Sequence, residues 1–177
     1  MRNKKDKAEI KFINRYLNLH KDRRDDLLKL LEMRNYDVEG YREYFLFLIR
    51  YYNCFVDINN SDKLIRDIND KFKSPLRSYE LNYTKSAEKA YFKWLLDKRN
   101  GYNYYNKTLI KIFDITEDEQ KQLKTIISKD EKVRRAKLKN WYNDKRDEER
   151  TKDREITNTE IIKMLSQNKT YEEIERL

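Results

Sequence analysis

The chain has 177 residues, of which 41% are charged, and its 41 Lys and Arg exceed its 32 Asp and Glu to give a formal net charge of +9. With two glycines and one proline, it has too few turn residues for a hairpin-rich β fold or for a glycine loop that cradles phosphates. The single cysteine, Cys54, excludes an internal disulfide and cysteine-based zinc sites. We therefore expect an all-α protein whose helices have narrow apolar faces and charged outer faces.

Two helices are predicted in the first 34 residues, over 1–19 and over 22–34. His20 is the only histidine, and it lies between them beside cationic residues, where we expect it to be exposed. The apolar face of the second helix consists of Leu27, Leu28, Leu30 and Leu31.

The most apolar stretch is 41–56, which predicts a helix that is apolar on most sides and therefore central in the fold. An aromatic row can also stack on nucleic-acid bases, but core packing is the preferred interpretation for most of these rings. The main apolar stripe consists of Tyr41, Phe45, Leu48, Ile49, Tyr52 and Val56.

A further helix is predicted from Ser61 or Asp62, either of which can cap it, to Phe72. Pro75 ends it, because the residue before a proline is driven away from the helical conformation. The next helix is predicted over 78–98. After the break that ends at Gly101, residues 102–105 form a polar aromatic connector, with one short strand as the alternative.

Two capping boxes follow, in which a hydroxyl at the N-cap precedes a carboxylate by three residues. Thr116–Glu119 comes after a short predicted helix over 107–114, and it opens a helix with Leu123, Ile126 and Ile127 on its inner face. Ser128–Glu131 places a helix boundary or a kink near Ser128.

From 129 to 156 apolar residues nearly vanish, which predicts an extended, exposed helix that frays beyond Asn143. Its first half is strongly basic. Because cations neutralise phosphates and rings stack on unpaired bases, this helix is the main candidate for a nucleic-acid-binding site; a charged spacer without a ligand is the alternative. Its candidate binding residues are Arg134, Arg135, Lys137, Lys139, Trp141, Lys145 and Arg146.

The tail, 157–177, predicts a short helix capped by Asn158 or Thr159, a turn at 167–169 and a second helix opened by a capping box at 170–173. A helix-turn-helix begins in this way. We expect a truncated helix-turn-helix, with a simple helical hairpin as the alternative.

No motif brings together the residue types that catalysis needs. Asp62, Asp67 and Asp70 can be imagined as metal ligands, but a solvated helix face is the preferred interpretation. We expect a non-enzymatic protein with no catalytic residue, no metal site and no cofactor.

A more specific pattern lies in DINDKFKSPLRSYELNYTKSAEKAY, which runs from Asp67 to Tyr91. It has an N-x-x-F-x-x-P-L core, an acidic–apolar pair and a Ser-Ala helix. With the preceding helices, it resembles the helical primase-C-terminal module of plasmid and phage replication proteins. The motif residues are Asn69, Phe72, Pro75, Leu76, Glu80, Leu81, Ser86 and Ala87.

The segment GYNYYNKTLIKIFDITEDEQKQLKTIISKDEKVRR, residues 101–135, is similar to a segment of helix-turn-helix replication proteins from Gram-positive mobile elements. The two resemblances cover 22–135 and imply a DNA-associated role in mobile-element replication, without a catalytic site. The predicted domains are an N-terminal basic helix (1–21), a helical bundle (22–128, of which 22–98 is primase-C-terminal-like), an extended charged helix (129–156) and the partial helix-turn-helix (157–177).

The leading hypothesis is therefore a nucleic-acid-binding protein, with DNA favoured over RNA. Around the proline turn, Lys73, Arg77, Lys85 and Lys89 are expected to add phosphate contacts. The alternative is a phage- or plasmid-borne inhibitor of the anti-CRISPR type, which binds a host nucleic-acid enzyme or its guide RNA.

Two further expectations concern partners and location. Trp141 on an exposed helix is a candidate contact in a homodimer. No apolar run approaches the ~20 residues of a membrane span, and the first residues lack the apolar core of a secretory signal, so we expect a cytoplasmic protein without a membrane partner.

Overall fold

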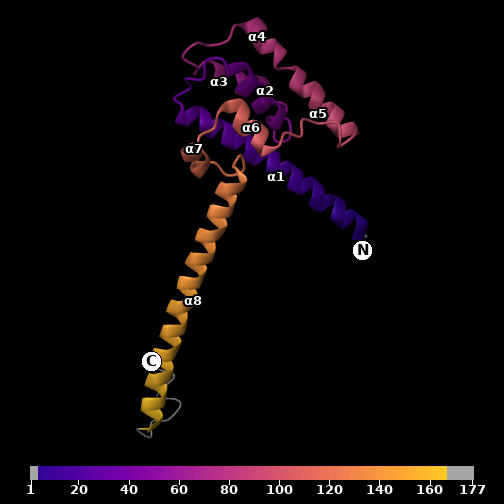
Figure 1. Cartoon of the computed structure of the whole chain (residues 1–177). Coiled ribbons are helices and arrows are strands. Elements are labelled where there is room, and N and C mark those ends of the chain that lie inside the picture. The colour runs from indigo at the N-terminus through magenta and orange to yellow at the C-terminus, as the bar shows by residue number, and fades with distance from the viewer. Residues whose placement is uncertain (1–3, 167–177) are drawn as a thin grey trace. The chain divides into compact units, whose positions relative to one another are not determined.

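The computed structural model describes the backbone of residues 4–166 and the side chains of residues 10–166 (Figure 1). All regular secondary structure in that range is α-helical, which confirms the all-α class. The described residues up to Glu131 form one compact unit, and those from Lys132 onward form a second. The helices are α1 (Lys4–Met33), α2 (Arg42–Asn53), α3 (Ser61–Asn69), α4 (Ser78–Tyr83), α5 (Ser86–Leu96), α6 (Asn106–Phe113), α7 (Glu117–Gln122) and α8 (Lys129–Ser166).

The two helices expected over 1–19 and 22–34 are one continuous helix, α1. No glycine or proline interrupts it, and the carboxylate expected at the second N-terminus has another partner: Asp22 accepts a hydrogen bond from Lys124 Nζ at 2.8 Å. The prediction of two helices was wrong because an aspartate that favours the first turn of a helix can instead pair with a lysine from a distant segment.

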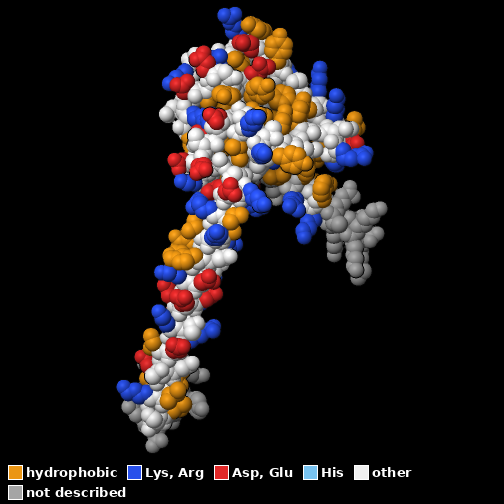
Figure 2. All heavy atoms as spheres, viewed as in Figure 1, with side chains coloured by type: hydrophobic (Ala, Val, Ile, Leu, Met, Phe, Trp, Pro, Cys, Tyr) orange, Lys and Arg blue, Asp and Glu red, His pale blue; other side chains and the backbone are white. Residues whose placement is uncertain are grey.

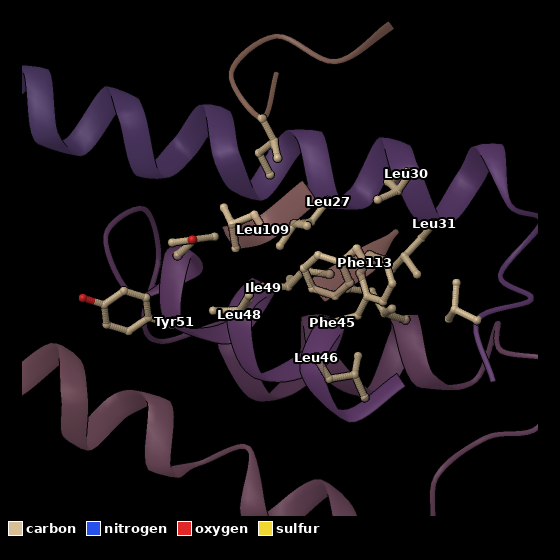
Figure 3. Packing of buried hydrophobic residues seen from close by; sticks show 14 of the residues in the cluster. Leu27, Leu30, Leu31, Phe45, Leu46, Leu48, Ile49, Tyr51, Leu109 and Phe113 are labelled. Carbon is tan, nitrogen blue, oxygen red and sulfur yellow. The ribbon is translucent and has the colours of Figure 1, made fainter. Parts of the chain in front are cut away.

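As predicted, the helix over 41–56 is central. Its helical part, α2, packs against α1, α3, α4 and α5. Figure 3 shows side chains of α1, α2 and α6 converging on this core. Tyr41 and Val56 are exceptions, because they lie just outside α2 and are 38% and 42% exposed. The fully buried residues include Leu27, Leu30, Leu31, Phe45, Leu46, Ile49, Leu109 and Phe113.

The loop around Pro75 is held by the side chain of Asn69, at the end of α3. Asn69 Oδ1 accepts a hydrogen bond from Leu76 N at 2.8 Å, and Asn69 Nδ2 donates to Leu76 O at 3.1 Å. Phe72, which belongs to the same loop, is buried. The N-x-x-F-x-x-P-L pattern is therefore explained by folding, since its asparagine fixes the turn that its proline requires.

The helix predicted over 78–98 is divided into α4 and α5. At the division, Thr84 is buried and its hydroxyl donates to Leu81 O at 2.6 Å. The strand considered for 102–105 is absent from the described chain, because Tyr102 N–H donates to the hydroxyl of Tyr51 at 3.1 Å and has no neighbouring strand. Asn60, at the position before α3, takes the N-cap place predicted for Ser61 or Asp62.

The capping box of Thr116 and Glu119 is confirmed. Thr116 Oγ1 accepts from Glu119 N at 3.2 Å, and Glu119 Oε2 accepts from Thr116 N at 2.9 Å. Helix α7 is shorter than predicted and ends at Gln122, but Leu123 and Ile126 are still buried in the loop that follows. The boundary predicted near Ser128 is also confirmed, since its hydroxyl accepts from Glu131 N at 3.1 Å.

A buried carboxylate anchors the turn at 124–126. Asp26, on α1, is 3% exposed and accepts hydrogen bonds from the backbone N–H groups of Lys124, Thr125 and Ile126 at 2.6, 2.6 and 2.8 Å. The hydroxyl of Thr125 donates a fourth hydrogen bond at 2.6 Å. One side chain thereby satisfies three consecutive N–H groups just before α8 begins.

Helix α8 is continuous from Lys129 to Ser166, so the fraying predicted beyond Asn143 and the helix boundary predicted at Asn158 or Thr159 were wrong. The hydroxyls of Thr157 and Thr159 donate to the carbonyls of Asp153 and Glu155, four residues earlier, at 2.9 and 2.7 Å. Such bonds are compatible with an uninterrupted helix, which the many Lys, Arg and Glu residues favour. The predicted turn at 167–169 and the second tail helix lie outside the described residues.

His20 is buried, contrary to expectation: it is 1% exposed, and its ring stacks on that of Phe55 with centroids 4.0 Å apart. Neither ring nitrogen has a hydrogen-bond partner among the described residues. Burial, reinforced by the charge of Arg23, lowers the pKa of His20 to about 3. Folding therefore favours the neutral ring.

This burial predicts sensitivity to acid. Below the ordinary histidine pKa of about 6.5, the unfolded chain binds a proton that the folded chain excludes, so stability falls as the pH decreases from there toward 3. Between pH 7 and 5, this histidine is expected to remove about 2 kcal/mol from the free energy of unfolding. Urea unfolding at both pH values, for the natural chain and for His20→Leu, measures this. If the natural chain and His20→Leu lose equal free energy of unfolding between the two pH values, His20 is not the cause of the acid sensitivity.

Candidate nucleic-acid interface

Helix α8 carries a cationic stretch from 132 to 143 that contains no acidic residue. Beyond it, 144–155 contains five cations and six acids, so the charge of that part nearly cancels. Figure 2 shows Lys and Arg near the start of α8, and acidic and basic side chains intermixed further along. The five cations of the stretch are Lys132, Arg134, Arg135, Lys137 and Lys139.

Side chains 100° apart around a helix distribute these cations over more than one face. Lys132, Arg135 and Lys139 follow one side at intervals of three and four residues, and Arg146 continues that line. Arg134, Lys137 and Lys145 lie toward the opposite side. The structure thus places the predicted residues on one helix but not on one stripe. A nucleic-acid backbone that wraps around the helix would contact cations on both sides, and one that follows a single side would still contact several of them.

Exposed rings accompany the cations of α8. Trp141 is 50% exposed and Tyr142 is 65% exposed, with their ring centroids 4.8 Å apart. Lys145 Nζ lies 4.7 Å from the centroid of the Trp141 ring, close enough for a cation–π interaction. An exposed ring beside a cation can contact both a base and a phosphate.

The four cations predicted around the proline turn are not gathered at one point. Lys73 pairs with Asp37 at 2.5 Å, and both side chains are more than half exposed. Arg77 forms the N-cap of α4, and its backbone N–H donates to Glu80 Oε2 at 2.6 Å. Lys85 and Lys89 lie four residues apart at the start of α5, on its exposed surface.

Lys93 was not predicted as a binding residue, although it follows Lys85 and Lys89 on α5. Lys93 is also exposed and continues the line of Lys85 and Lys89 at the same spacing of four residues. The i, i+4 spacing within the predicted helix over 78–98 was the pattern that could have identified it.

The carboxylates considered as metal ligands, Asp62, Asp67 and Asp70, do not belong to any group that could hold a metal ion in the described chain. Asp62 pairs with Arg50 at 2.7 Å. The hydrogen bond from Arg50, together with the positive charge of its guanidinium, lowers the pKa of the Asp62 carboxyl. Across the described residues, no group of three or more His, Cys, Asp and Glu side chains could hold a metal ion. Among the helices within 4–166, none combines the length and apolar character needed to cross a membrane.

Comparison with known proteins finds a similar protein in Clostridium perfringens, which is named a replication protein. The two are 42% identical over 125 residues, which make up 69% of this chain and 30% of the relative. The chain thus spans less than a third of that relative's length. No family model and no solved structure matches the chain. The similarity supports a relationship to replication proteins, while the resemblance to the primase-C-terminal module stays a prediction.

Proposed function

We propose that the chain is a non-enzymatic nucleic-acid-binding module of the kind that accompanies mobile-element replication proteins, with DNA as its ligand and α8 as its main contact. The observation that carries the proposal is the acid-free cationic stretch 132–143 on one continuous helix, in a chain similar to a replication protein. Five cations there can displace counterions from phosphates, which is the sequence-independent part of nucleic-acid affinity.

The test compares two variants that change the net charge equally. The first replaces Lys132, Lys137 and Lys139 by Gln within the acid-free stretch. The second replaces Arg150, Lys152 and Arg154 by Gln where acids are interspersed. Each removes three positive charges from one helix, so each lowers the net charge of the chain by the same amount, and circular dichroism checks that the helix content is kept.

The first variant is expected to bind a DNA duplex ~10- to 100-fold more weakly at low salt, because three phosphate contacts are lost. The slope of the logarithm of affinity against the logarithm of salt concentration should decrease by about 2.7, or 0.9 per contact. The second variant should keep the natural slope, since its cations are already balanced by neighbouring acids. Equal losses in the two variants would show that net charge, and not this stretch, determines binding.

A further inference from the structure

A second surface, the tyrosine groove, lies in the unit that ends at Glu131. It has a volume of about 490 Å³ and is formed by α2, the end of α4, the start of α5, the loop before α6 and α6 itself. Figure 2 shows hydrophobic side chains gathered on this face, over the region where Figure 1 places α2, α5 and α6. The residues of the groove that matter here are Glu43, Tyr44, Phe47, Tyr83, Tyr102 and Tyr104.

Two tyrosines at the groove present their rings to solvent, since Tyr44 is 56% exposed and Tyr83 is 64% exposed. Neither ring takes part in a described aromatic contact, so neither is needed to fill the core. Large exposed rings on a folded surface are common singly, but several around one depression indicate a binding surface.

Two other tyrosines are held in place. The rings of Tyr102 and Tyr104 are nearly parallel, at 4°, with centroids 5.8 Å apart. Phe47 and Tyr51 meet the ring of Tyr102 edge-on, at 86° and 87°. A Cβ at Gly101 would lie 2.7 Å from Tyr51 Oη, so the close approach of this loop requires glycine. These rings are therefore positioned before any ligand arrives.

Cations border the groove on one side. An adjoining depression shares Ser86 and Tyr102 with it and adds Lys89 and Lys93. Against these two lysines, Glu43 is the one acidic residue that lines either depression. Rings beside these two lysines complement a ligand with flat apolar faces and a linked negative charge.

We propose that the tyrosine groove binds the unpaired bases of single-stranded nucleic acid, with its phosphates along Lys89 and Lys93. Stacking on tyrosine requires a free base face, which a duplex does not offer except at its ends. The inference rests on the proposed function and specifies the form of nucleic acid that this second surface recognises, whereas the cations of α8 contact the backbone of either form.

The experiment uses the full chain, a labelled oligothymidylate and a duplex of equal length. One variant combines Tyr44→Ala with Tyr83→Ala. The control combines Tyr79→Ala with Tyr105→Ala, two tyrosines that are 56% and 81% exposed but do not line the groove. All three proteins are titrated at low salt by fluorescence anisotropy, and their unfolding midpoints are compared.

The groove variant is expected to bind the single strand at least about 25-fold more weakly, since each of its two lost stacks costs roughly 5- to 140-fold. Its binding to the duplex and its midpoint should stay at natural values, and the control should match the natural chain throughout. If the groove variant binds the single strand like the natural chain, the inference is overturned and the proposed function stands. If the natural chain binds neither the single strand nor the duplex, both the inference and the proposed function are contradicted. Loss of a protein partner on Tyr44→Ala and Tyr83→Ala, with unchanged oligonucleotide binding, would assign the groove to protein and also overturn the inference.

Discussion

Replacing Asp26 by Ala is expected to lower the free energy of unfolding by about 4 kcal/mol, because four hydrogen bonds to one buried carboxylate are lost together. A hydrogen bond to a charged group contributes about 1.5–3 kcal/mol, and bonds that share one acceptor are not additive. The substitution also leaves three N–H groups of the 124–126 turn without this partner. Urea unfolding followed by circular dichroism measures the change.

Asp25→Ala is the matched control for Asp26→Ala. Asp25 is the adjacent carboxylate on α1, its side chain is 47% exposed, and its partner is the neighbouring Arg24 at 2.7 Å. A surface substitution of this kind is expected to change stability by no more than about 0.5 kcal/mol. If the two variants differ by less than about 1 kcal/mol, Asp26 does not anchor the turn as described.

The second large effect concerns the buried guanidinium of Arg50, which is 2% exposed. Arg50 Nη1 contacts Asp62 at 2.7 Å and Glu88 at 2.5 Å, and these acids belong to α3 and α5. Replacing both, as Asp62→Asn with Glu88→Gln, is expected to cost about 3 kcal/mol, because it leaves a buried charge without a counter-charge. Each single substitution should cost much less, since one carboxylate remains.

A third change tests the cause of that loss. Adding Arg50→Met to the double variant removes the uncompensated charge, and it is expected to recover a large part of the stability lost. Thermal and urea unfolding of the natural chain, the double variant and the triple variant measure the recovery. A triple variant that is less stable than the double variant would show that Arg50 contributes by packing and not through its charge.

The features of this fold that the sequence predicts correctly are those whose interacting residues are close together along the chain. The central place of α2 follows from its own composition, and the Thr116–Glu119 capping box is a pattern of four neighbouring residues. Both were predicted correctly. The hydrogen-bond partners of Asp26, Lys124, Thr125 and Ile126, are 98 to 100 residues away. Nothing in the local sequence distinguishes Asp26 from the adjacent Asp25 before the chain has folded.

The failures have a common physical origin. At Asp22, Asn158 and Thr159, residues that favour helix N-termini lie inside continuous helices, since their polar groups have partners there or lie on an exposed helix surface. His20 was expected at the surface because charged residues surround it in sequence, yet it packs against the rings of Tyr52, at the end of α2, and Phe55, in the turn that follows. Local sequence does not report such tertiary partners.

For the candidate site, the sequence identifies the residue types better than their arrangement. The cationic run on α8 and the exposure of Trp141 were predicted, but the spread of the cations around the helix follows from continuous helical geometry. The tyrosine groove was not predicted, because its rings come from α2, α4 and the loop before α6. Tyrosines 44, 83 and 102 become neighbours only in the folded chain.

The central claim is that the chain holds nucleic acid through the cations of α8. Its most direct test is the affinity of the natural chain for a labelled DNA, measured by fluorescence anisotropy between about 50 and 200 mM salt. The account predicts a complex at the lower salt concentration that weakens linearly on logarithmic axes as salt rises, with a slope of several units. If no complex forms with single- or double-stranded DNA at the lower concentration, or if the affinity does not depend on salt, the account is contradicted.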